Sequence, residues 1–107
     1  MGQMTGKTVV VTGGNTGIGK EICLEFGSEG ANVVVNWIFG EDLALEVVKE
    51  VEAAGGKGIA VYGDVTKMEE SKNIIETGIE TFGRVDVLIN NSGITRDNLM
   101  MRMTEEE

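Results

Sequence analysis

Proline and histidine are absent from this sequence of 107 residues, and cysteine occurs once, as Cys23. A single cysteine excludes a disulfide within the chain, and the lack of histidine removes His-dependent catalytic triads and the usual zinc clusters. Without proline, turns must depend on residues that tolerate positive φ, and sixteen glycines are available for this.

Basic residues are few as well, since nine lysines and arginines accompany eighteen acidic residues, for a net charge of −9. This charge has the wrong sign for binding a nucleic-acid backbone. No apolar run approaches the roughly 18 residues of a membrane-spanning helix, and residues 1–7 lack the apolar region of a signal sequence. We therefore expect one cytoplasmic domain over residues 1–107, with no nucleic-acid or membrane partner.

Four short runs of β-branched residues suggest strands. The runs are continuous in hydrophobicity, as is typical of strands buried on both faces of a parallel sheet. They comprise Thr8–Thr12, Asn32–Asn36, Gly58–Tyr62 and Val85–Asn90.

The three segments between these runs have the apolar period of amphipathic helices. The repeated positions are Ile18, Ile22 and Phe26, then Leu43, Val47 and Val51, then Ile75, Ile79 and Phe82. A glycine follows each segment, at Gly30, at Gly55 and Gly56, and at Gly83, where a left-handed residue would end the helix.

The order β-α-β-α-β-α-β predicts a three-layer, Rossmann-like α/β fold with a parallel sheet in strand order 3-2-1-4. In this order the strand Val85–Asn90 lies at an edge of the sheet. An apolar edge with unpaired backbone groups favours pairing between chains, so we expect a homo-oligomer.

A glycine-rich turn, spaced G-x-x-x-G-x-G, joins the first strand to the first helix at Gly13, Gly17 and Gly19. Free amides and the positive end of the helix dipole at such a turn can bind a pyrophosphate. Side chains at Gly13 and Gly17 would obstruct that approach, and Gly19 would let the helix pack closely. A turn without a ligand is the alternative, but three glycines at these offsets favour dinucleotide binding.

The adenosine ribose of a dinucleotide is usually met about 20 residues after this turn, which points to Asn36 and Trp37. Asn36 carries no charge that would select NAD, and no lysine or arginine follows it to attract the 2′-phosphate of NADP. We expect weak discrimination between the two. Trp37 can stack on adenine or pack at the strand end.

Polar residues also follow the third and fourth strands. Asp64 can accept a hydrogen bond from an adenine amino group, or Asp64 or Thr66 can cap the next helix. Asn90 and Asn91 can tie their loop to neighbouring strands and line the cofactor crevice, or they can belong to an ordinary turn.

Taken together, the three segments Thr12-Gly13-x-x-x-Gly17-Ile18-Gly19, Asp64-Val65 and Asn90-Asn91-Ser92-Gly93 resemble the short-chain dehydrogenase/reductase family. The resemblance extends from about Gly6 to the last residue. The stretch from Phe82 to Met103 is similar to the 3-oxoacyl-[acyl-carrier-protein] reductases, and the front half is equally similar to bacterial glucose 1-dehydrogenases.

The resemblance implies an NADP or NAD site formed by Gly13, Asn15, Thr16, Gly17, Ile18, Gly19, Asp64, Val65, Asn90, Asn91 and Gly93. Thr16 stands where many NADPH-using relatives have arginine, which weakens the case for NADPH. The implied parent reaction is NAD(P)H-dependent reduction of a carbonyl in fatty-acid biosynthesis, with acyl carrier protein as a possible partner.

The resemblance offers no catalytic residue, because the family's catalytic asparagine, serine, tyrosine and lysine would follow the last residue of this sequence. Tyr62 is the only tyrosine and has no lysine four positions on. We expect the front part of a longer reductase, inactive alone, and the capping-box pattern of Thr104–Glu107 agrees. The alternative is a truncated or engineered Rossmann module that binds nucleotide or self-associates without catalysis.

Overall fold

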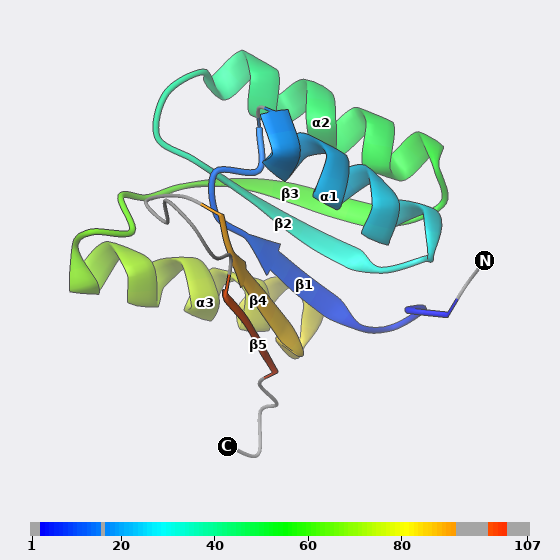
Figure 1. The fold of residues 1–107 in the computed structure, drawn as a ribbon. Coiled ribbons are helices and arrows are strands. Elements are labelled where there is room, and N and C mark those ends of the chain that lie inside the picture. Colours follow the sequence, from blue (N-terminus) through cyan, green and yellow to red (C-terminus); the bar gives the residue numbers. More distant parts are fainter. Residues whose placement is uncertain (1–2, 16, 92–98, 103–107) are drawn as a thin grey trace.

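The computed structural model describes residues 3–15, 17–91 and 99–102 and contains five strands and three helices in these residues (Figure 1). Strands and helices alternate as far as the fourth strand, and the fifth strand follows it. Their bounds are β1 (Thr8–Val11), α1 (Gly17–Ser28), β2 (Asn32–Trp37), α2 (Glu41–Ala53), β3 (Lys57–Tyr62), α3 (Met68–Phe82), β4 (Val87–Asn90) and β5 (Leu99–Arg102).

The strands form one sheet in the order β3-β2-β1-β4-β5, and the first four are parallel. This confirms the predicted order 3-2-1-4. Helices α1 and α2 cover one face and α3 covers the other (Figure 1). Val9 and Val11 of the central strand β1 belong to the core under α1 and α2, whereas Val10 belongs to the core under α3. Burial on both faces explains the continuous valine run.

Strand β5 departs from the prediction, because it pairs antiparallel with β4, with Val87 opposite Arg102 and Asn90 opposite Leu99. The expectation that β4 is an edge strand is therefore wrong. The segment Leu99–Arg102 escaped notice because it is short, rich in methionine and free of β-branched residues. Because β4 is paired with both β1 and β5, it offers no open edge for pairing between chains.

The buried face of α1 is displaced by one residue from the predicted one. Its fully covered residues are Gly19, Cys23 and Gly27, which we call the small-residue seam, while Ile18 is 67% exposed. A side chain at Gly27 would press on Val51 of α2, with contacts of 3.0–3.3 Å. The seam therefore brings α1 close to its neighbours.

In α2 the predicted burial of Val47 and Val51 is confirmed, but Ala44 is buried in place of Leu43, which is 44% exposed. The displacement recurs in α3, where the buried residues are Ile74 and Gly78. The predicted ends are confirmed, because Gly30, Gly55 and Gly83 all have positive φ.

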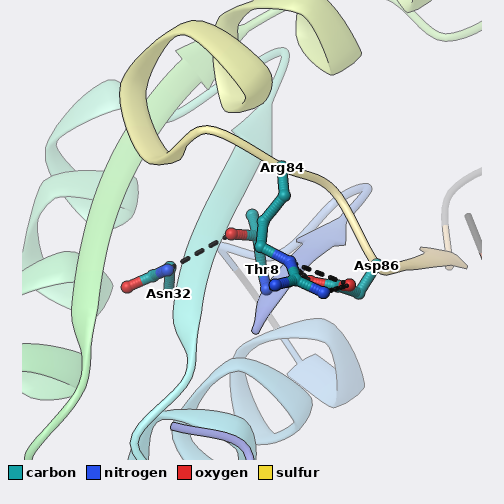
Figure 2. A network of polar contacts seen from close by, with 4 residues as sticks. All are labelled: Thr8, Asn32, Arg84 and Asp86. Carbon is teal, nitrogen blue, oxygen red and sulfur yellow. Dashed lines mark hydrogen bonds and ion pairs between the residues drawn. The ribbon is translucent and has the colours of Figure 1, made fainter. Parts of the chain in front are cut away.

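Four polar residues, Thr8, Asn32, Arg84 and Asp86, hold the amino edge of the sheet (Figure 2). The buried Asp86 carboxylate accepts hydrogen bonds from the Thr8 backbone N–H at 2.9 Å and from the Arg84 guanidinium at 2.6–3.0 Å. The Asp86 N–H donates to the Thr8 carbonyl, and Asn32 donates to the Thr8 hydroxyl. These bonds fix where the chain leading to β4 meets β1.

Stability should depend on the ionisation of Asp86. Burial raises its pKa, but the bonds from Arg84 and Thr8 and the charges of Arg84 and Lys7 prevail and lower it below the ordinary value. A lowered pKa in the folded state stabilises the protein above the unfolded-state pKa of about 3.9 and loses this effect as pH falls through the folded value.

We therefore expect Asp86→Asn to lower the free energy of unfolding by about 1–3 kcal/mol at pH 7, with the difference shrinking as pH falls below about 4. Urea unfolding of both proteins between pH 7 and pH 3 measures it. A difference that stays constant over this range would contradict an ionised Asp86 as its source.

Candidate functional site

The candidate site lies at the carboxyl ends of the parallel strands, where open α/β sheets bind their ligands. The turn after β1 contains two positive-φ glycines, Gly13 at 62° and Gly17 at 55°. Apart from its chain neighbours and the backbone of its own helix, none of the described residues has an atom within 4 Å of where a Gly17 side chain would begin, so this part of the structure leaves space open beside the start of α1. The first-turn amides, including those of Gly17, Ile18 and Gly19, have no acceptor inside the helix. They can serve an anion.

Gly13 and Gly14 contribute shape to the site rather than free amides. The Gly13 N–H donates to Oδ1 of Asn36 at 3.1 Å, and the Gly14 N–H donates to the Asn36 carbonyl at 3.0 Å. Gly13 and Gly14 therefore offer no free amide to an anion, and the first-turn amides of α1 remain as candidates.

Gly19 and Cys23 of α1 pack against the turn. A side chain at Gly19 would overlap the Gly13 carbonyl oxygen and come within 2.8 Å of Nδ2 of Asn91, so only glycine fits there. The Cys23 thiol donates to the Gly14 carbonyl, with a sulfur to oxygen distance of 3.6 Å. Burial raises the pKa of this thiol to about 12, so Cys23 is a packing residue and not a nucleophile.

Asn15 ties the turn to the loop after β2. Its side-chain amide donates to the carbonyl of Phe39 at 2.7 Å and to that of Gly40 at 3.2 Å, and the residue is only 7% exposed. The amide therefore fixes this loop beside the turn.

The end of β4 is tied to the turn as the paired amides predicted. The Thr12 hydroxyl donates to Oδ1 of Asn90 and accepts the Asn91 N–H at 2.7 Å, and Nδ2 of Asn91 donates to the Gly13 carbonyl at 3.4 Å. Thr12 was not among the candidate binding residues, although its place directly before Gly13 could have suggested this role.

Asn36 and Trp37 occupy different environments. Asn36 is fully buried, and its Nδ2 donates to the carbonyls of Val61 and Gly63, so a contact with a ribose would require breaking these bonds. Trp37 is half-buried and packs edge-to-face on Tyr62, with ring centroids 5.2 Å apart. Both roles considered for Trp37, packing and adenine stacking, are compatible with this place.

Asp64 lies two residues after the end of β3, with one carboxylate oxygen engaged. Its Oδ1 accepts the N–H and the hydroxyl of Thr66, and these two bonds, aided by Lys67, outweigh desolvation and lower the pKa of the carboxyl. Within the described part of the chain Oδ2 has no donor and can receive one from a ligand. Glu70 reaches back to the Asp64 N–H at 2.7 Å, a contact that the sequence analysis missed.

Neither Asp64 nor Thr66 caps α3, whose N-cap residue is Lys67. Val65 is half-buried and lines an open hollow of about 430 Å³ with Met68, Ser71, Lys72 and others along α3. The remaining predicted positions, Thr16, Ser92 and Gly93, lie outside the described residues.

The described residues contain no cluster of three or more metal-ligating side chains. None of their helices is both long enough and apolar enough to cross a membrane.

Gly19→Ala should destabilise the protein, because the added methyl group must displace the Gly13 carbonyl. We expect a loss of about 1–3 kcal/mol in the free energy of unfolding, as for overpacked cores. Gly58→Ala in β3 is the matched control, since its methyl group would meet neighbours at 3.4–3.6 Å. Urea unfolding compares them, and equal stabilities would contradict the close approach at Gly19.

Comparison with known proteins agrees with this architecture. The family model for short chain dehydrogenases matches residues 7–107. The curated 3-oxoacyl-[acyl-carrier-protein] reductase FabG of Staphylococcus epidermidis is 46% identical over 101 residues, which are 94% of this chain and 41% of that protein. The FabG of Staphylococcus aureus strain Mu50 is 45% identical with the same coverage.

Solved structures give a similar result. A short chain dehydrogenase from Mycobacterium avium has a TM-score of 0.81 and 44% identity, covering 91% of this chain and 36% of that one. A hydroxysteroid dehydrogenase from Escherichia coli has a TM-score of 0.78 and 40% identity, covering 85% and 38%. The chain spans about 41% of the length of its curated relatives. It belongs to the short-chain dehydrogenase family, whose members are NAD(P)-dependent oxidoreductases.

Proposed function

We propose that this chain is the NAD(P)-binding part of a short-chain oxidoreductase whose parent reaction is the NAD(P)H-dependent reduction of a 3-oxoacyl-[acyl-carrier-protein]. The observation that carries the proposal is the open space beside Gly17, where first-turn amides of α1 face the carboxyl edge of a parallel sheet. Similarity to the FabG proteins supports the substrate class.

Several residues would hold the cofactor. The amides of Gly17 and Ile18 would bind the pyrophosphate, and the amide of Gly19 lies in the same helical turn. The free oxygen of Asp64 would accept the adenine amino group, with Val65 beside it. The bound cofactor supplies the hydride, and these residues orient its adenine end.

We propose that the cofactor is NADP or NAD and that the chain discriminates only weakly between the two. Asn36 is committed to the protein interior, and the next residues, Trp37, Ile38 and Phe39, have no charge. Neither a carboxylate for two ribose hydroxyls nor a cation for a 2′-phosphate is therefore present at the end of β2. Glu41 and Asp42 are exposed in the first turn of α2, where they complement the helix dipole.

The chain by itself is proposed to bind without turnover. Tyr62, the only tyrosine, is 54% exposed, but Thr66 stands four positions on, where a lysine partner would be needed. Reduction of a carbonyl requires a positioned acid, so the second candidate function is a nucleotide-binding module without catalysis. An assay of NADPH consumption with an acetoacetyl thioester tests this, because turnover by the chain alone would contradict binding without catalysis.

Calorimetric titration with NAD, NADP and AMP should show binding, and Gly17→Val should weaken it at least about tenfold, because valine disfavours the positive φ and fills the open space. Gly6→Val is the control, since Gly6 also has positive φ and, among the described residues beyond its chain neighbours, no atom within 4 Å of an added side chain, but it precedes β1. The NAD and NADP affinities should agree within about a hundredfold, or roughly 2.7 kcal/mol. Equal binding by the Gly17 variant would place the site elsewhere.

We also propose a homo-oligomer, and, for the parent enzyme, a cytoplasmic location and acyl carrier protein as partner. Support for self-association comes from exposed apolar side chains, including Phe39 and Met68, each 85% exposed. Sedimentation equilibrium at micromolar concentration should give a dimer or larger species. A monomer across that range would contradict the proposal.

A further inference from the structure

The Asn36 side chain joins two segments, the turn after β1 and the end of β3. Its Oδ1 accepts the Gly13 N–H of the turn after β1, while its Nδ2 donates to Val61 at 3.2 Å and to Gly63 at 3.0 Å, at the end of β3. Its backbone carbonyl accepts the Gly14 N–H. The side chain lies at 0% exposure, so water does not compete for these bonds.

The chemistry of this position suits asparagine and few other residues. Two carbonyls require a group with two donor hydrogens, and the Gly13 N–H requires an acceptor on the same short side chain. Aspartate would turn an oxygen toward the carbonyls of Val61 and Gly63, and serine has one donor and shorter reach. An unpaired polar group would remain buried after either change, which is costly.

The two segments that Asn36 joins are those that a bound nucleotide would contact at the same time. Gly13 and Gly14 lead into the start of α1, and Gly63 is followed directly by Asp64. We infer that Asn36 is a positioning residue that sets the spacing between the anion-binding turn and the adenine-binding segment. This inference rests on the proposed function and assigns Asn36 no contact with the nucleotide.

Two kinds of ligand separate positioning from general support. ADP reaches from the turn to the adenine segment, whereas inorganic pyrophosphate contacts only the turn. We expect Asn36→Ala to weaken ADP binding at least about tenfold and pyrophosphate binding by less than about threefold, because the start of α1 keeps its amides. Calorimetry is done at a temperature where circular dichroism shows the variant to be folded.

Asn32→Ala is the matched control. Asn32 is the first residue of the same strand, β2, and therefore lies at the end of the strand away from Asn36. It is half-buried and donates one hydrogen bond to the Thr8 hydroxyl at 3.2 Å. Its ADP affinity should stay within about twofold of the native value. The inference is overturned if Asn36→Ala binds ADP with native affinity, if both ligands weaken equally, or if Asn32→Ala weakens ADP binding as much.

A measurement on the native chain decides the matter if Asn36→Ala does not fold. Added pyrophosphate should shift the NMR signals of the Asn36 side-chain amide and of the Asp64 N–H as well as those of the turn, because Asn36 bonds both the Gly13 N–H and the Gly63 carbonyl. Shifts confined to the turn would overturn the inference.

Hydrogen exchange separates failure of the inference from failure of the proposed function. If the native chain binds neither ligand, the proposed function fails, and exchange of the Gly13 and Asp64 amides still tests Asn36. Exchange that is at least about tenfold faster at both amides in Asn36→Ala, but not in Asn32→Ala, supports the link between the segments. Unchanged exchange refutes it.

Discussion

The close approach of α1 to the sheet and to the turn before it is the constraint on which the site depends. The small-residue seam lets the helix axis come near, and Gly14 leaves room for the Cys23 sulfur, which would otherwise lie 2.8 Å from a side-chain carbon. The turn is thereby pressed between α1 and the strand ends. The residues of the seam have small side chains or none, so the backbone of α1 lies directly against the turn. A shift of the helix would therefore change the shape of the turn.

The two edges of the sheet are held by different chemistry. At the amino edge the buried carboxylate of Asp86 is matched by Arg84, which gives strong but pH-dependent bonds. At the carboxyl edge three neutral amides, Asn15, Asn36 and Asn91, bind backbone groups instead. These cross-links add no negative charge at the carboxyl edge of a chain whose net charge is already −9, which favours the proposed binding of an anion there.

The sequence was sufficient to predict the order of the four parallel strands and the helix ends, because valine runs, glycines and spacing are local signals. It was insufficient for the faces of the helices. Counting large apolar residues selected Ile18 and Leu43, whereas the helices bury Gly19 and Ala44, since close packing favours small residues that hydrophobicity ranks low. Strand β5 was missed because its four residues have no strong strand propensity, and only the pairing with β4 in the folded structure makes them a strand.

Asn36 shows most clearly why the role of a residue is harder to predict than its location. Counting from the glycine turn placed it correctly at the end of β2, beside the region where a ribose would lie. Its bonding partners are 23 to 27 residues away in the chain, so no local pattern reveals them. An uncharged amide at this position is equally suited to facing a ligand or to joining backbone segments. The Asn36 acceptor oxygen is paired with one N–H and its two donor hydrogens with two carbonyls, which favours the second role. In that role Asn36 affects ligand binding only through the spacing between the segments that it joins.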